Sequence, residues 1–196
     1  MQKIIFLLIS FSVSVGLSAQ ITGLNEEVVT IPIIEGKVAF IKEIPLPAGN
    51  SRTQAFEKID RWASDSYGRD PFVSSVRVDK EDLEIVAKSR IELLLPVDSN
   101  GKRERFVMRY RINSFVTEDN KCVLEVVDIA LLYQANKGDA KANKIPRLLR
   151  AENFISDQAI NIDDDLSEVR LNTKKSTLYF INQLFKNFEV ALGYVY

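Results

Sequence analysis

Four consecutive segments of alternating apolar and polar residues, separated by three short polar turns, constrain the fold of this chain more than any other feature. The segments cover residues 71–78, 83–95, 103–116 and 122–133. A period of two residues is typical of strands with one buried and one exposed face. The second turn contains Asn100-Gly101, a strong signal for a β-hairpin. The pattern therefore predicts a four-stranded antiparallel meander.

The registers predicted from the three turns support one another. The turns are centred on residues 80–81, 100–101 and 119–120. The predicted apolar pairs include Val76 with Ile85, Leu93 with Met108, and Met108 with Leu131. On the other face Glu92 meets Arg109, Asp128 meets Arg111, and Arg90 also faces Arg111. A slip of one residue would transfer every side chain to the wrong face. Alternation falters at residues 113–115, where we expect a β-bulge.

Two amphipathic helices flank the meander in the sequence. Ser51 and Gln54 match a capping box, and Gly68 is a natural end for the helix that begins there. A second helix is predicted over residues 173–191, with a terminal strand over residues 188–196 as the alternative. Each helix has one apolar stripe to bury, so both are expected to cover the apolar face of the sheet.

The predicted order is strand, helix, four strands and helix, which is an α+β fold. The first strand covers residues 37–45, within a single domain over residues 36–196 that follows a leader at residues 20–35. Residues 134–172 are polar and are expected to form a long loop or insertion, with a short helix over residues 145–154.

Residues 1–19 match a secretory signal peptide. Lys3 precedes an apolar run from Ile4 to Val15, and small residues lead to Ala19, after which we expect cleavage. The apolar run is shorter than a membrane span requires, and an uncleaved N-terminal anchor is the alternative. The chain is therefore expected to be periplasmic or secreted, without an integral membrane span in its mature form.

Residue counts exclude several classes of chemistry. Cys122 is the only cysteine, so the chain forms no internal disulfide and carries no lipid on a cysteine next to the signal segment. The chain has no histidine, which excludes Ser-His-Asp and Cys-His nucleophiles and imidazole-based zinc sites. A formal net charge of −1 argues against a nucleic-acid partner, because such proteins neutralise phosphates. We expect no cofactor.

Several short motifs carry a resemblance to a known family. They lie at residues 36–40, 55–63, 78–88 and 109–112. Together they make residues 36–133 similar to a family of exported bacterial proteins, the domain of unknown function 4468 with TBP-like fold. The resemblance implies a TBP-like β-α-β4-α topology with two helices packed on one face of an antiparallel sheet. It implies no functional residue, because the family has no assigned activity, and a fold alone does not imply DNA binding.

An arginine stripe on the third strand of the meander is the main candidate for a binding site. The stripe consists of Arg103, Arg105, Arg109 and Arg111, with Lys88 and Arg90 beside it. Such a surface would bind an anionic group, for example a glycan carboxylate or a lipid phosphate. The competing interpretation is a solvated sheet face, since Glu92 and Asp128 lie opposite two of the arginines. The candidate ligand-binding residues are Lys88, Arg90, Arg109 and Arg111, of which Arg90 is the least well matched.

Other patterns have both a chemical and a structural interpretation. Asp163, Asp164 and Asp165, with Glu168, would offer oxygen ligands to calcium or form a solvated turn. Asp79, Glu81, Asp82 and Glu84 contain the carboxylate pair that glycoside hydrolysis requires, but they lie at a tight turn. Trp62 would stack on a sugar or belong to the core. We predict neither a metal site nor a catalytic residue.

Three functions remain open. The favoured one is a non-catalytic cell-envelope module that binds an unknown envelope protein or an anionic surface ligand. The alternatives are a carboxylate-dependent hydrolase and a structural component of an envelope assembly.

Overall fold

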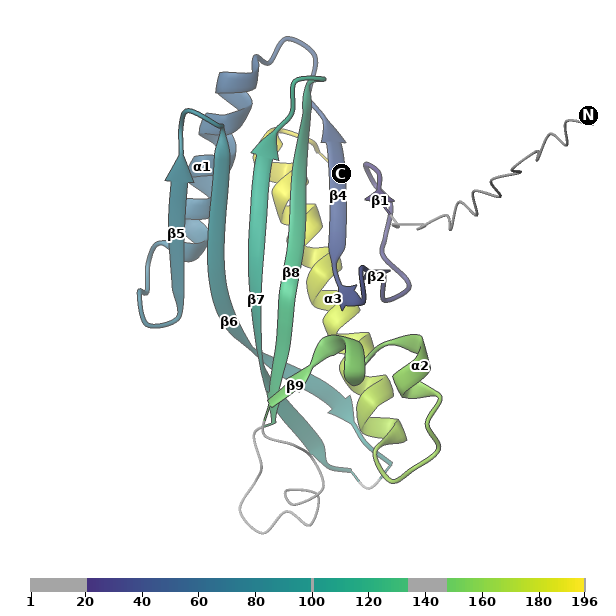
Figure 1. Cartoon of the computed structure of the whole chain (residues 1–196). Helices are drawn as coiled ribbons and strands as arrows, with labels where there is room; N and C mark the ends of the chain where they lie inside the picture. The colour runs from purple at the N-terminus through teal and green to yellow at the C-terminus, as the bar shows by residue number, and fades with distance from the viewer. Residues whose placement is uncertain (1–20, 100, 134–147, 196) are drawn as a thin grey trace, which may run out of the picture.

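A long, curved sheet covered on one face by two helices makes up the molecule (Figure 1). The computed structural model describes residues 21–99, 101–133 and 148–195, so the predicted signal peptide lies outside the described residues. In spatial order the strands are β1 (Ile21–Thr22), β4 (Phe40–Pro45), β8 (Lys121–Tyr133), β7 (Arg103–Val116), β6 (Glu84–Val97) and β5 (Ser74–Asp79). All neighbours in this order are antiparallel except β1 and β4, which are parallel. The predicted meander is confirmed.

The remaining elements lie around this sheet. They are the ribbon of β2 (Ile33–Ile34) and β3 (Lys37–Val38), strand β9 (Leu148–Arg150), a 3₁₀ turn (Ala151–Asn153), and the helices α1 (Arg52–Tyr67), α2 (Asp157–Ile160) and α3 (Ser167–Leu192). The predicted order of strand, helix, four strands and helix is thus confirmed, with short elements added at both ends. Among the described residues, none of the helices is long and apolar enough to cross a membrane.

Helix α1 begins and ends where its sequence predicts. The Ser51 side chain accepts a hydrogen bond from the Gln54 N–H at 3.2 Å, and the Gln54 side chain accepts one from the Ser51 N–H at 2.9 Å. At the other end the Gly68 N–H donates to the Ser64 carbonyl at 2.9 Å. Between these caps, the side chains on one stripe are buried against the sheet: Ala55, Phe56, Ile59, Ala63 and Tyr67.

The registers of the first two hairpins differ from the prediction by two residues. Leu93 pairs with Phe106 instead of Met108. The pair next to the turn, Val97 with Arg103, is already one residue from the predicted register, and a bulge between Leu94 and Val97 adds one more residue on β6. Val76 pairs with Ala87 instead of Ile85. In this first hairpin, the turn between the last paired residues, Asp79 and Glu84, contains four residues instead of the two that the predicted register implies. An even offset keeps each side chain on its predicted face, so the core is unaffected.

The third hairpin keeps its predicted register on one side of a bulge. Met108 pairs with Leu131, as predicted. The bulge lies at Asp128 on β8, where the backbone has φ 53°, and not at residues 113–115 of β7. Residues 113–115 continue the regular ladder opposite β8.

Part of the segment expected to be a loop or insertion is folded onto the domain. Residues 134–147 of it lie outside the described residues. Of the helix predicted over residues 145–154, the described part forms strand β9 at Leu148–Arg150 and only one helical turn, the 3₁₀ turn at Ala151–Asn153. Strand β4 pairs with β8 only as far as Val126, which leaves the edge around Leu131 free for β9. This pairing overrides the local helical pattern.

The C-terminal helix is longer than predicted, and the alternative terminal strand is wrong. Helix α3 begins at Ser167 and continues to Leu192, where Gly193 ends it with φ 106°. Phe188 and Leu192 are fully buried. Their burial against the sheet requires helical spacing, which explains why the alternating pattern at the C-terminus does not form a strand.

The leader packs against the body of the domain. Val28 and Ile31 are buried in the core. The Asn182 side chain of α3 accepts a hydrogen bond from the Val28 N–H at 2.8 Å and donates one to the Val28 carbonyl at 3.0 Å. The first strand, predicted over residues 37–45, is divided into β3 and β4 at Ala39.

Candidate functional site

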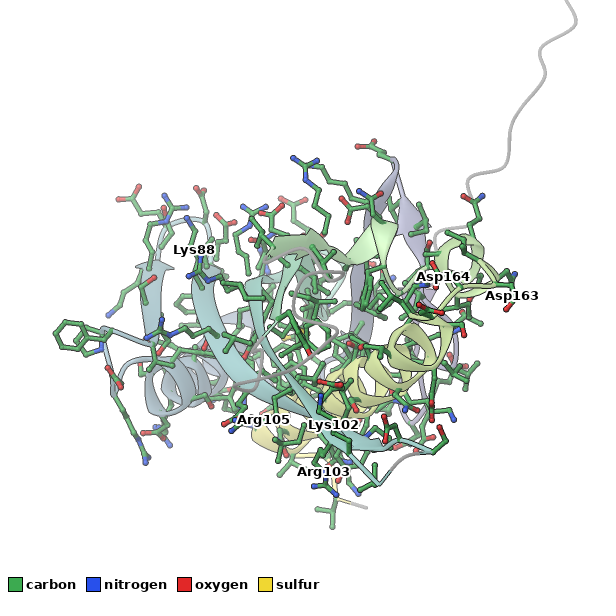
Figure 2. All side chains as sticks on the ribbon, turned by 90° about the horizontal axis from the view of Figure 1, so that it is seen from below. Lys88, Lys102, Arg103, Arg105, Asp163 and Asp164 are labelled. Carbon is green, nitrogen blue, oxygen red and sulfur yellow. The ribbon has the colours of Figure 1, made fainter. Side chains whose placement is uncertain are left out.

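The face of the sheet opposite the helices carries the four predicted ligand-binding residues. Strand alternation directs Ala87, which is buried, and Ile91, which is partly buried, to the helix side. It directs Lys88 and Arg90 of β6 to the other side. Figure 2 shows Lys88 pointing away from the helices. Arg109 and Arg111 of β7 occupy the same open face.

The observed register places these cations directly opposite one another. Lys88 pairs with Arg111, and Arg90 pairs with Arg109. The predicted pairing of Glu92 with Arg109 is wrong, since the two-residue offset moves Glu92 next to Arg105, 3.3 Å away. Like charges opposite one another across two strands are destabilising. The register thus removes the cross-strand carboxylate that was expected to neutralise Arg109.

One ion pair orients the cluster. Arg111 Nε lies 2.9 Å from Asp128 Oδ2, as the sequence predicts. The positive φ of the bulge at Asp128 presents this carboxylate to the open face. Within the part of the chain that the structure describes, Lys88, Arg90 and Arg109 have no ion-pair partner. The cluster is therefore mostly uncompensated.

The four cations line a hollow of about 460 Å³, which we call the basic groove. Of the described residues that line it, Asp128 is the one carboxylate. A second hollow of about 570 Å³ shares Lys88 and Arg111 with it and extends the groove toward Arg77 and Glu84. Guanidinium groups bind carboxylates and phosphates through paired hydrogen bonds. The groove is open to solvent, so its attraction for anions is expected to weaken with salt.

Phe72 at the rim of the basic groove was not among the predicted site residues. Its side chain is 88% exposed. The sequence placed it in a strand over residues 71–78, but β5 begins only at Ser74 because the Asp70 side chain accepts a hydrogen bond from the Phe72 N–H at 2.9 Å. The Asp70-Pro71 pair is a turn signal that would have placed Phe72 in the loop.

The arginine stripe is not one site. Arg103 lines a different hollow, and Arg105 pairs with Glu92. Figure 2 shows Arg103, Arg105 and Lys102 together and well apart from Lys88. The bend of β6 and β7 separates the two ends of the stripe, which a count of alternating residues does not reveal.

The acidic candidates have structural partners. Asp164 pairs with Arg170 at 2.7 Å, and Glu168 accepts hydrogen bonds from the backbone and side chain of Ser99. Among the described residues, no group of three potential metal ligands comes together. The Asp79 side chain accepts hydrogen bonds from two backbone N–H groups of its own turn, those of Glu81 and Asp82. These contacts support the structural interpretation of both clusters.

Trp62 and Cys122 belong to the core. The Trp62 ring packs edge-on against Tyr67 and Phe188, with centroid distances of 5.7 and 5.1 Å. Burial raises the pKa of the Cys122 thiol to about 12, so almost no thiolate is present at neutral pH. The thiol is therefore a packed apolar group.

Comparison with known proteins agrees with this fold. Residues 40–131 match the family model of the domain of unknown function DUF4468 with TBP-like fold. A TBP-like protein from Parabacteroides distasonis has a similar structure, with a TM-score of 0.69 and 25% identity over 85% of this chain and 99% of the other. A DUF4468 family protein from Bacteroides ovatus has a TM-score of 0.67 and 21% identity, over 86% of this chain and 94% of the other. No curated protein matches the chain.

Proposed function

Since residues 40–131 match the DUF4468 family model and the sheet has a TBP-like fold, we propose that this chain is a non-catalytic binding module of the cell envelope. In this proposal the protein is exported by its signal peptide to the periplasm or cell surface. There it captures an anionic group, a phosphate or a carboxylate, in the basic groove.

The direct opposition of cations across β6 and β7 carries the proposal. Two like-charged pairs, Lys88 with Arg111 and Arg90 with Arg109, are held side by side on the sheet. Only Asp128 supplies an opposite charge among the described residues of the groove. A bound anion would relieve this repulsion, so the free energy that the register costs is recovered on binding.

Two further observations favour binding over catalysis and over nucleic-acid recognition. The chain has no histidine, and its cysteine is buried with a raised pKa. Its formal net charge of −1 gives no long-range attraction for a polyphosphate backbone, even though the fold is TBP-like. The cluster of cations is local and suits a single anionic group.

The double variant Arg90→Glu/Arg109→Glu tests the proposal. Vesicles of an anionic phospholipid and an acidic polysaccharide serve as separate probes for phosphate and carboxylate. We expect the double variant to bind the preferred probe at least about tenfold more weakly, because it loses charge-assisted hydrogen bonds. Wild-type binding should weaken as salt is raised.

The double variant Arg61→Glu/Lys80→Glu is the matched control, since it makes the same total charge change at two exposed positions outside the basic groove. Circular dichroism verifies that each variant is folded. Equal binding by the wild type and the double variant would refute the proposal. An equal loss in the Arg61→Glu/Lys80→Glu variant would show that overall charge, and not the basic groove, governs binding.

A further inference from the structure

Half of β6 has an unpaired edge. Strand β5 pairs with β6 only as far as Ser89, whereas β6 continues to Val97. Figure 1 shows β6 extending beyond the end of β5 and bending away beneath the sheet. On that side, no strand among the residues that the structure describes pairs with the stretch from Arg90 to Val97, which we call the free edge. At about 3.3 Å per residue the free edge spans roughly 25 Å.

The backbone of the free edge is oriented for strand pairing. The Ser176 hydroxyl of α3 donates a hydrogen bond to the Leu94 carbonyl at 3.1 Å, which shows that this carbonyl faces away from β7. The pairing with β7 is regular from Arg90 to Leu94, so alternation directs the N–H and C=O groups of Arg90 and Glu92 to the same side. Such an edge is a template for another strand.

An apolar groove runs beside the free edge. A hollow of about 600 Å³ lies between β6 and α3, with Leu93 and Leu95 buried beneath it. Its exposed apolar lining includes Tyr179 of α3, 70% exposed, and Leu94, 51% exposed. A neighbouring hollow of about 500 Å³ shares Phe180 with it and continues toward the end of β5. Alternate side chains of an added strand would pack into this groove.

A second copy of this chain does not complement the free edge. Suppose that the β6 strands of two copies pair antiparallel, with their buried faces on the same side of the joined sheet. If the two-fold axis passes through Glu92, the two Glu92 side chains lie opposite each other. Moving the centre by one residue sets Arg90 opposite Pro96, which has no N–H to donate. Centring on Ile91 matches Arg90 with Glu92, but the pairing then stops at once because Ser89 is already paired with β5.

The charges along the free edge favour an acidic occupant. Four cationic side chains line the two hollows, against two anionic ones: Arg69, Arg90, Arg103 and Lys175, against Asp70 and Glu92. Glu92 is also paired with Arg105, and Arg69 with Asp65, which leaves Arg90, Arg103 and Lys175 against Asp70. A strand with carboxylates on its outer face would therefore find uncompensated positive charge.

We propose that the free edge of β6 binds an extended, acidic segment of a partner protein as an added strand. Main-chain hydrogen bonds to β6 would supply affinity, as in other cases of β-strand addition. The partner's apolar side chains lie in the groove against Tyr179 and Phe180, and its carboxylates face Arg90 and Arg103. This site shares Arg90 with the basic groove, but it needs no anion bound there.

Selection of short random peptides displayed on phage, with the immobilised full chain as bait, tests this proposal. We expect the enriched peptides to alternate apolar and acidic residues. Binding of such a peptide should slow hydrogen exchange in residues 90–96. Tyr179→Ser should weaken binding about tenfold, because it removes an aromatic wall of the groove.

Val190→Ser, which changes another exposed apolar residue of α3 outside the groove, is the control and should bind normally. Glu92→Pro removes one outward N–H and should also block binding. Anion binding should be unchanged in Tyr179→Ser, so the two proposals can fail separately. The proposal is overturned by absence of enrichment, by exchange protection outside residues 90–96, or by normal peptide binding in Tyr179→Ser.

Discussion

At the scale of single residues, a buried ion pair joins strand β4 to helix α3. Lys42 Nζ lies 2.9 Å from Glu189 Oε1, with side chains 1% and 3% exposed. The lysine also donates to the Glu26 carbonyl at 3.0 Å, and Glu189 accepts from the Asn25 N–H at 3.2 Å. Strand alternation places Lys42 on the same face as Phe40 and Ile44, but it cannot reveal the glutamate that compensates the charge.

Lys42→Met is expected to destabilise the domain by about 3–5 kcal/mol, because it leaves Glu189 buried without its partner. Urea unfolding monitored by tryptophan fluorescence measures the change. Lys121→Met is the control, since Lys121 pairs with Glu43 at the surface, 3.1 Å away and 41% exposed. A loss no larger than that of the control would mean that the buried pair contributes little. The double variant Lys42→Met/Glu189→Leu should recover much of the stability, since no unpaired charge remains.

At the scale of elements, local signals predicted helix ends and strand positions well, and pairing details less well. The predicted bounds of β7, residues 103–116, are those observed. The capping box at Ser51 and the stop at Gly68 also agree. These features depend on neighbours within a few residues. The bulges at Asp128 and before Val97 depend on partner strands and sheet curvature, so the pairing of Arg90 with Arg109 could not be read from turn centres.

Ser51→Ala should cost about 1 kcal/mol of stability, because the first turn of α1 loses its side-chain cap. Thermal and urea unfolding measure the loss. Thr53→Ala, at an exposed position two residues into the same helix, is the matched control and should be neutral or slightly stabilising. Equal stability of the Ser51 variant and the wild type would show that the cap is replaced by solvent at no cost.

At the scale of the whole molecule, segments from opposite parts of the described sequence contact each other. The leader before β2 packs on α3, which belongs to the C-terminal part of the chain, and the two-point hydrogen bonding between Asn182 and Val28 fixes this contact. Tyr194 also donates a hydrogen bond to the carbonyl of Pro45, the last residue of β4, at 2.6 Å. The sequence indicates a leader, and only the fold shows that it is part of the core.

Asn182→Ala should release the leader while the sheet remains folded. Removing both hydrogen bonds from the Val28 backbone is expected to increase proteolytic cleavage within residues 21–32 about tenfold. Limited proteolysis with mass spectrometry detects the cleaved bond. Asn187→Ala, an exposed change on the same helix, should leave the cleavage rate unchanged. Unaltered cleavage in Asn182→Ala would indicate that apolar contacts alone hold the leader.

Some features of the candidate site follow from local sequence patterns, and others depend on tertiary structure. Alternation was sufficient to put Lys88, Arg90, Arg109 and Arg111 on one open face, because side-chain direction along a strand has a fixed period. The sequence also supplied the charge balance and the chemistry that the chain lacks. The direct opposition of like charges, the rim residue Phe72 and the free edge of β6 arise from bulges, turn lengths and unequal strand lengths. These depend on contacts between segments distant in the sequence, which no local pattern encodes.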